Sequence, residues 1–463
     1  MRYVSTRGEA PELGFEDVLL TGLALDGGLY LPSHWPQLGA DQLRALRGKS
    51  YAEIACAVIA PYTAGAIPDA GLQRMLKLAY ADFGHPAVAP LTQLGPNHFL
   101  LELFHGPTLA FKDVAMQLLA PMMDWALARR GTRATIVGAT SGDTGGAALE
   151  AFKASQHAST FILHPHGRVS EVQRRQMTTV QSAAIHNIAL EGTFDDAQAI
   201  VKALFNDHAF RARTGLSGVN SINWARILAQ IVYYVSSALS LGSPDRPVRF
   251  TVPTGNFGDV FAGYAAMCMG LPVERLIIAT NSNDILHRAL STGRYEITGV
   301  TPSSSPSMDI QVSSNFERLL YAASGRDPHA VRAMMAGLSQ SGAFTIPPAA
   351  LAAIRAQFSS GAAPEAEVAT AIRRTLQDTG ELLDPHSAVA VCVAQAQPES
   401  AAPMITLATA HPAKFPDAVE KACAIRPALP HRLQGLLSAP ERYTVLPNSI
   451  DAVKTFILNR TPS

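Results

Sequence analysis

The chain has 463 residues, of which 48% are hydrophobic and 16% are charged, and its formal net charge is zero. This length exceeds one ordinary domain, and the composition can bury a large core, which excludes a disordered chain. The balanced charge provides no extended field for nucleic acid, so an anionic ligand must be held by a local site.

Four cysteines are spread along the chain without a C-x-x-C pair, so the sequence predicts neither a structural metal site nor a disulfide framework. Residues 1–8 are polar and lack the apolar core of a signal peptide. No uninterrupted apolar run approaches the about 20 residues that span a bilayer. We therefore expect a cytoplasmic protein that binds neither nucleic acid nor membrane.

The first part of the chain differs in pattern from the rest. Residues 41–60 and 70–83 have the periodicity of helices. Residues 84–95 contain two prolines and two glycines, which are typical of a boundary. The sequence therefore predicts a mainly helical N-terminal domain over residues 1–95.

After this region, apolar strand patterns alternate with helical patterns. Such alternation predicts parallel sheets that are covered by helices on both faces. Ligands of these sheets bind beyond the carboxyl ends of the strands. We expect strands at 99–104, 135–137, 160–163, 184–190, 248–252 and 276–279, and helices at 112–130, 145–154, 169–181, 195–206, 223–241 and 258–269.

One loop after a predicted strand carries a lysine in an unusual position. The segment from His105 to Asp113 places Lys112 in the first turn of the helix expected at 112–130. The positive end of the helix dipole favours the neutral amine, which is the nucleophilic form of lysine. On spacing alone, a solvated lysine beside Asp113 is an equally good interpretation.

Two glycine-rich loops also lie between a strand and a helix. Residues 138–146 read GATSGDTGG, and residues 253–259 read PTGNFGD. Their glycines allow close approach of a ligand, and the N–H groups at a helix N-terminus can hold a phosphate or carboxylate. Neither matches a Walker loop or G-x-G-x-x-G. The alternative for both is a tight turn that caps a helix.

Three later segments are polar without a complete motif of their own. They are residues 307–318 (SMDIQVSSNFER), 384–387 (DPHS) and 406–415 (TLATAHPAKF). A serine hydrolase is not favoured, because the chain lacks a G-x-S-x-G elbow. The paired ligands of a zinc enzyme, H-E-x-x-H, are absent as well.

Together these blocks resemble the threonine synthase family, which belongs to the fold-type II pyridoxal-phosphate enzymes related to the tryptophan synthase beta chain. The resemblance runs in order along almost the whole chain. Besides the loops above, it includes residues 3–8 (YVSTRG), 26–32 (DGGLYLP) and 220–223 (NSIN).

The resemblance implies an α/β fold of type II, with two parallel-sheet α/β domains and a mainly helical N-terminal domain. Residues 96–112 and 236–463 would form the large domain that binds the cofactor. Residues 113–235 would form a small α/β domain inserted into it, with the active site in between.

The resemblance also implies pyridoxal 5'-phosphate as the cofactor, held as a Schiff base by Lys112. The hydroxyl of Thr409 would lie against the pyridine nitrogen. The phosphate group of the cofactor would bind to Gly255, Asn256, Phe257 and Gly258.

For the substrate, the resemblance implies a carboxylate-binding loop. Related enzymes of this fold type often have asparagine at the position of Asp143, so we assign that residue no contact with the ring hydroxyl of the cofactor. Cations and N–H donors must hold the substrate phosphate, and our candidates are Asn315, Arg318 and Lys414. The loop itself consists of Thr140, Ser141, Gly142, Asp143 and Thr144.

The implied enzyme is a carbon–oxygen lyase that converts O-phospho-L-homoserine and water into L-threonine and phosphate, with Lys112 as the catalytic residue. The same motifs are compatible with a phospho-lyase that releases 2-oxobutyrate from this substrate. Another alternative is a non-catalytic metabolite-binding protein on the same fold.

Overall fold

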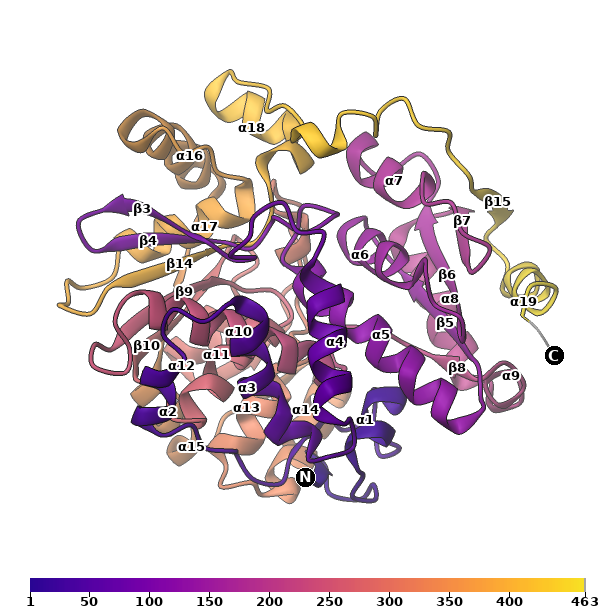
Figure 1. The fold of residues 1–463 in the computed structure, drawn as a ribbon, viewed down its shortest axis with the longest axis horizontal. Helices are drawn as coiled ribbons and strands as arrows, with labels where there is room; N and C mark the ends of the chain where they lie inside the picture. The colour runs from indigo at the N-terminus through magenta and orange to yellow at the C-terminus, as the bar shows by residue number, and fades with distance from the viewer. Residues whose placement is uncertain (462–463) are drawn as a thin grey trace.

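The computed structural model describes residues 1–461, and its two largest sheets are each flanked by helices (Figure 1). All strand pairs in these sheets are parallel except one hairpin. The α/β prediction is therefore confirmed, and so are the parallel sheets.

The N-terminal region is mainly helical. Strands β1 (Tyr3–Ser5) and β2 (Tyr30–Pro32) pair antiparallel, and the helices are α1 (Phe15–Thr21), α2 (Ala40–Ala45), α3 (Tyr51–Thr63) and α4 (Asp69–Tyr80). The single helix expected over residues 41–60 is wrong, because α2 ends at Ala45 and a new helix, α3, begins after Ser50. The Ser50 side chain accepts from the N–H of Glu53, whose carboxylate accepts from the N–H of Ser50. This reciprocal cap begins α3.

The larger sheet has six strands in the order β13-β10-β9-β14-β4-β3. Helix α17 packs on β9, β10 and β14, and α11 lies on the opposite face of the sheet (Figure 1). The strands are β3 (Leu91–Gly95), β4 (His98–Glu102), β9 (Val248–Pro253), β10 (Val273–Thr280), β13 (Phe358–Ala362) and β14 (Met404–Ala408).

The second sheet has five parallel strands in the order β15-β7-β6-β5-β8. Helices α6 and α7 lie on its side toward the larger sheet, and α19 lies on the other side (Figure 1). The strands are β5 (Ala134–Ala139), β6 (Ala158–Pro165), β7 (Ile185–Glu191), β8 (Leu216–Ser217) and β15 (Thr444–Pro447).

The remaining helices connect these strands. They are α5 (Lys112–Arg130), α6 (Asp143–Phe152), α7 (Glu171–Thr178), α8 (Phe194–Asn206), α9 (His208–Thr214), α10 (Trp224–Ser240), α11 (Gly258–Cys268), α12 (Ile285–Thr292), α13 (Phe316–Ala323), α14 (Pro328–Ser341), α15 (Pro348–Gln357), α16 (Glu365–Thr379), α17 (Pro385–Gln395), α18 (Pro416–Cys423) and α19 (Ile450–Leu458). Strands β11 (Arg294–Glu296) and β12 (Ala343–Thr345) pair antiparallel as a short two-stranded sheet.

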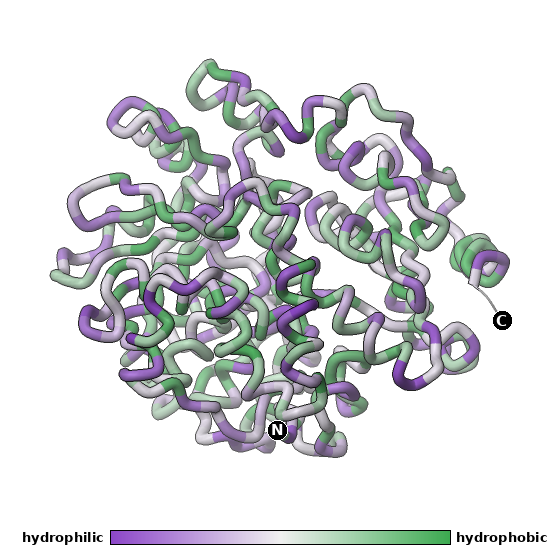
Figure 2. The backbone as a smooth tube through the Cα atoms, in the orientation of Figure 1, coloured by the Kyte–Doolittle hydropathy of each residue, from purple (hydrophilic) through white to green (hydrophobic). Residues whose placement is uncertain are grey.

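The core is centred on α10, which is buried along most of its length and packs against α3, α5 and α11. Helix α5 contacts α10 on one side and α6 on the other, so it joins the two sheets into one body. Many hydrophilic stretches lie on outer turns, as Figure 2 shows.

Strand pairing differs from the expected domain limits at two places. Strand β3 forms a hairpin with β4, so the larger sheet begins before residue 96. Strand β15 pairs with β7, although we expected all of 236–463 in the large domain. The chain after α18 crosses over the molecule to reach this edge (Figure 1). The other domain limits stay predictions.

Candidate active site

Lys112 lies where two chain segments run side by side at the carboxyl ends of β4 and β14. The N–H of Phe111 donates to the carbonyl of Thr409 at 2.8 Å, and the N–H of His411 donates to the carbonyl of Leu109 at 3.0 Å. These bonds fix the beginning of α5 next to Thr409. The Lys112 side chain is buried there, with 9% of the residue exposed.

The loop before Lys112 is held by its own carboxylate. Asp113 accepts from the backbone N–H of Thr108 at 2.7 Å and from its hydroxyl at 2.6 Å. A Cβ at Gly106 would collide with the side chain of Asp113, so only glycine fits at this turn. Burial raises the pKa of Asp113 to about 6. The loop is therefore built around a desolvated acid.

Three buried charges meet at Asp143. One of its oxygens, Oδ2, lies 3.2 Å from Nζ of Lys112, and the other, Oδ1, lies 3.1 Å from Nζ of Lys414. Burial lowers the pKa of Lys112, and the Asp143 carboxylate offsets this only in part. Burial opposes ionisation of Asp143 as well, but the two lysines hold its pKa well below the usual range. The site thus combines an ionised acid with an amine that loses its proton readily.

Helix α7 closes the site from the smaller sheet. Nε2 of Gln173 donates to Oδ1 of Asp143 at 2.9 Å. Nε2 of Gln176 donates to the carbonyl of Thr108 at 3.0 Å, and its Oε1 accepts from Lys414 at 2.9 Å. The sequence analysis missed both glutamines. The available signal was their spacing of three residues, which places them on one face of a helix after a strand.

In the loop from Thr140 to Thr144, the residues have different positions. The hydroxyl of Thr140 accepts from the N–H groups of Gly142 at 2.9 Å and Gly145 at 3.0 Å, so it shapes the turn. Ser141 is exposed and Thr144 is half-buried. Those two hydroxyls are the ones accessible to a ligand.

The loop before α11 fits a phosphate group. The backbone N–H groups of Gly255, Asn256, Phe257 and Gly258 have no hydrogen-bond acceptor within residues 1–461. They lie at the N-terminus of an 11-residue helix, where the dipole favours an anion. A Cβ at Gly255 would lie 2.7 Å from the carbonyl oxygen of Ser307. The loop is thus already folded around free donors.

Family models match nearly the whole chain. "Threonine synthase N terminus" matches residues 2–80, "Pyridoxal-phosphate dependent enzyme" matches 87–409, and "Threonine synthase, C-terminal" matches 387–457. The chain belongs to the threonine synthase family. It is therefore a lyase that depends on pyridoxal phosphate, with the fold of the type II enzymes.

Individual relatives agree with this family over their full length. Threonine synthase of Pseudomonas aeruginosa is 53% identical, and the alignment covers 99% of this chain and 98% of that protein. The PLP-bound threonine synthase of Brucella melitensis has a TM-score of 0.99 at 60% identity and full coverage of both chains. Yeast threonine synthase has a TM-score of 0.95 at 38% identity, covering 99% of this chain and 98% of that chain.

Two of the residues that we expected to bind the substrate phosphate, Arg318 and Asn315, form hydrogen bonds within the protein. Arg318 is fully buried, and its guanidinium donates to the carbonyls of Tyr30 and Ile222 and to Asn315 Oδ1. Nδ2 of Asn315 donates to the carbonyl of Asn256 at 3.0 Å. These contacts connect both side chains to the backbone around the phosphate loop, and their binding of the substrate phosphate stays a prediction. A polar segment can be recognised in a sequence, but its partners cannot.

Arg226 is a buried cation that the sequence analysis missed. It is 3% exposed, Nη1 donates to the carbonyl of Val219 at 3.2 Å, and Nε has no partner among the described residues. No carboxylate within residues 1–461 forms an ion pair with it. Burial lowers its pKa to about 10, and its charge contributes to the lowered pKa of Lys112. The sequence feature that could have indicated Arg226 is its position three residues after Asn223, the last residue of the NSIN block.

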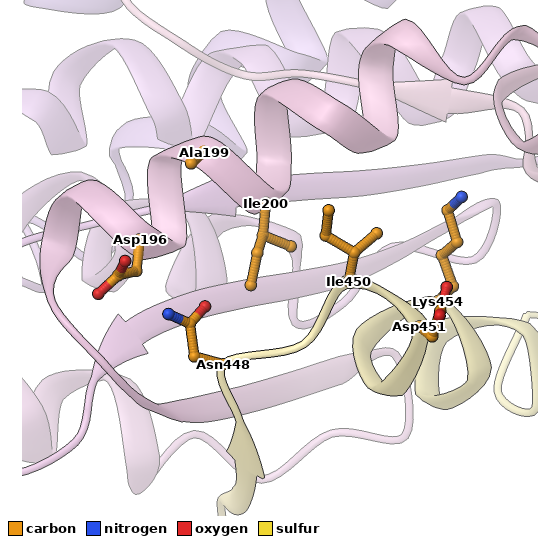
Figure 3. A pocket seen from close by; sticks show the side chains of 7 residues that line it. All are labelled: Asp196, Ala199, Ile200, Asn448, Ile450, Asp451 and Lys454. Atoms are coloured by element: carbon orange, nitrogen blue, oxygen red, sulfur yellow. The ribbon is translucent and has the colours of Figure 1, made fainter.

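A surface hollow between α8 and α19 lies apart from these groups. Figure 3 shows Asn448 and Ile450 on one side of it and Ala199 and Ile200 on the other. Its cation, Lys454, pairs with Asp207 at 2.6 Å. We assign no reaction to this hollow.

No helix among residues 1–461 is both long and apolar enough to cross a membrane. The cytoplasmic location stays a prediction.

Proposed function

We propose that the protein converts O-phospho-L-homoserine and water into L-threonine and phosphate. The observation that carries this proposal is the placement of buried Lys112 against Asp143, next to a loop of free N–H donors. A buried amine with a lowered pKa suits covalent attachment of a cofactor aldehyde.

Lys112 would carry pyridoxal phosphate, and residues 255–258 would hold its phosphate group. Thr409 lies beside Lys112 through the bond to Phe111, which supports a contact of its hydroxyl with the pyridine nitrogen. When bound, the cofactor supplies the electron sink that makes the α-proton of an amino acid acidic. The protein supplies positions and protons.

The substrate would bind across the gap between the two sheets. Ser141, Gly142 and Thr144 are candidates for its carboxylate, because the two hydroxyls are accessible and the loop precedes α6. For its phosphate we propose Lys414 and Arg226. Arg226 is a buried guanidinium without an ion-pair partner among the described residues, and such a charge is costly unless an anion joins it.

Proton transfer would rest on Lys112. Its neutral amine would take the α-proton of the substrate, and Asp143 would stabilise the resulting ammonium at 3.2 Å. The same group would also take a proton from Cβ so that phosphate can leave from Cγ. It would then return a proton to Cγ, and a second one to Cα after water has added at Cβ. Gln173 would keep Asp143 in place during these transfers.

A product assay with O-phospho-L-homoserine tests this function, run with the wild-type protein and with Lys112→Ala. We expect phosphate and threonine in equal amounts, and neither from the variant. Phosphate with 2-oxobutyrate would identify a phospho-lyase instead. Absence of turnover by wild-type protein that has bound the cofactor would reject this substrate.

A further inference from the structure

A buried aspartate–histidine pair lies beside the candidate active site and has no part in the chemistry above. Asp384 is the fully buried N-cap of α17, and His386 in the first turn is 4% exposed. Oδ1 of Asp384 accepts from the backbone N–H of His386 at 2.9 Å and lies 2.8 Å from Nδ1 of its ring. A carboxylate accepts only, so it selects the ring form with the proton on Nδ1 and a lone pair on Nε2.

The lone pair on Nε2 of His386 faces Ser307, which contacts the active-site residue Asp143. Nε2 accepts from the backbone N–H of Ser307 at 3.3 Å. The Ser307 hydroxyl donates to Oδ2 of Asp143 at 3.3 Å, and the same oxygen lies 3.2 Å from Nζ of Lys112. Nε2 of His386 is therefore connected to the amine of Lys112 through two intervening residues, Ser307 and Asp143.

The residues on both sides of Ser307 are held by other bonds, since the N–H of Met308 donates to the carbonyl of Ser305 at 2.9 Å and Asn281 donates to Asp309 at 2.8 Å. Ser307 lies in the 3₁₀ turn Pro306–Met308, which has no side-chain N-cap. Its carbonyl faces Gly255, where a Cβ would lie at 2.7 Å. The bond to His386 is thus the polar contact that holds this N–H while the hydroxyl reaches Asp143.

Asp384 is also linked to the segment at Thr409 through Ser387. The Ser387 hydroxyl binds Oδ2 of Asp384 and accepts from the N–H of Thr409 at 3.1 Å. A single carboxylate therefore anchors Ser307 through His386 and Thr409 through Ser387.

We propose that His386, held by Asp384, is a positioning residue that keeps the Ser307 hydroxyl on Asp143 and so fixes the proton between Asp143 and Lys112. This inference rests on the proposed function. Without the Ser307 hydroxyl as the second donor to Oδ2, the Asp143 carboxylate turns toward Lys414. The amine of Lys112 then transfers its proton with less accurate geometry. Substrate and one water then give more 2-oxobutyrate, ammonia and phosphate, in competition with threonine and phosphate.

Two substitutions of one residue separate the two ring nitrogens. His386→Asn keeps a donor for Asp384 but has no atom that reaches Ser307, whereas His386→Gln places Oε1 near the position of Nε2. We expect kcat to fall about ten-fold or more in His386→Asn, with KM within about two-fold and an increased share of 2-oxobutyrate. His386→Gln should recover much of this loss. Equal kcat values for both variants would overturn the proposal.

A matched control uses a half-buried histidine of the larger sheet. Nε2 of His98 in β4 lies 2.8 Å from the hydroxyl of Thr406, and its residue is at the other end of the strand from the active site. His98→Asn should retain the wild-type kcat and product ratio. If it loses as much as His386→Asn, the effect is a general loss of packing.

Ser307→Ala tests the route independently. Since His386 is proposed to act through the Ser307 hydroxyl, the losses in kcat should not add in the double variant with His386→Asn. Fully additive losses would overturn the route through Ser307. If His386→Asn fails to fold, the kcat of Ser307→Ala is compared with that of the double variant Ser307→Ala and His386→Gln. Additive losses in this pair would overturn the route in the same way.

The ring form can be measured without turnover. Nitrogen-15 spectra of the histidines, with His386 assigned by its loss in His386→Gln, should show a proton on Nδ1 and a bare Nε2. A proton on Nε2 would overturn the proposal. If the wild type gave the expected ring form but no product from O-phospho-L-homoserine, the proposed function would fail while this geometry stood.

Discussion

Among single residues, Asp143 has the most consequential environment. Two buried lysines and one glutamine share its two oxygens within 3.2 Å. A charge in this position is stabilised only by its neighbours, and each neighbour is stabilised by it. The protonation of Lys112 therefore depends on a residue of the other sheet.

Asp143→Asn should lower the pKa of Lys112 further. The carboxylate favours the charged ammonium, so its removal leaves burial and the charges of Lys414 and Arg226, all of which favour the neutral amine. The pH midpoint for attachment of pyridoxal phosphate to cofactor-free protein should shift down, while kcat falls. Cofactor absorbance at several pH values measures the midpoint.

Asp196→Asn provides the control for this measurement, because Asp196 is in the hollow beside α19. Its midpoint should equal that of the wild type. An upward shift in Asp143→Asn would mean that the carboxylate does not act on Lys112 as the geometry indicates.

Gly255→Ala should weaken the binding of the cofactor. The new Cβ would lie 2.7 Å from the carbonyl oxygen of Ser307, and backbone at that distance must move. We expect the dissociation constant of pyridoxal phosphate to rise about ten-fold or more, as free donors lose their geometry. Gly435→Ala is the matched control, because no atom lies within 4 Å of its Cβ. Fluorescence titration of cofactor-free protein compares them, and equal affinities would refute a tight phosphate loop.

Between elements, α13 links regions that are far apart in the sequence. Arg318 in its first turn bonds the carbonyl of Tyr30 in β2 and that of Ile222 before α10. Asn315, just before α13, bonds the carbonyl of Asn256 in the phosphate loop. The N-terminal region is thereby connected to the cofactor loop through two side chains.

Arg318→Met should destabilise the fold more than it affects substrate binding. The carbonyl of buried Tyr30 would be left without its donor, which costs about 1–3 kcal/mol, and the half-buried carbonyl of Ile222 would lose a donor as well. We expect a lower free energy of unfolding and a KM within about two-fold of the wild type. A strongly raised KM with normal stability would restore Arg318 as a ligand of the substrate phosphate.

The control for this variant is Arg426→Met. Arg426 is exposed and its partners, Asp417 and Glu420, are exposed carboxylates. Such surface pairs contribute little, so stability should change by less than about 1 kcal/mol. Denaturant unfolding of both variants gives the comparison.

For the whole molecule, the C-terminal crossing completes the smaller sheet. Strand β15 extends the edge at β7, and α19 packs on α8 with Val453 fully buried. Arg174 of α7 pairs with Glu441 at 2.9 Å on the way. The end of the chain thus stabilises the sheet that carries Asp143.

Val453→Ala should loosen the smaller sheet and leave the larger one intact. Loss of buried methyl groups leaves a cavity and costs about 1–3 kcal/mol. Hydrogen exchange should become faster in β6 and β7 and stay unchanged in β9 and β10. Val445→Ala, at a position 42% exposed, is the control. Equal acceleration in both sheets would mean that they unfold as one unit.

Much of the fold and part of the site could be predicted from the sequence. Strand and helix patterns are local, and parallel strands bring their carboxyl ends to one edge regardless of further detail. The loops with Lys112, Asp143 and Gly255 each follow a predicted strand, so the alternation alone placed them at strand ends, whereas the position of Thr409 came from the resemblance. The ordered blocks then indicated the family, which the comparisons confirm.

Only the tertiary structure decided which side chains contact which. Gln173 and Gln176 lie in a helix without a motif, and their partners come from segments 30 or more residues away. Arg226 follows the NSIN block, but its contact with the carbonyl of Val219 depends on the turn before α10. Arg318 resembled a ligand because it is charged, yet packing turned it toward backbone carbonyls. Polar partners are chosen by long-range packing, because a buried donor binds whichever acceptor the assembled core presents. The same reason explains β15, whose place depends on a free sheet edge that no local pattern shows.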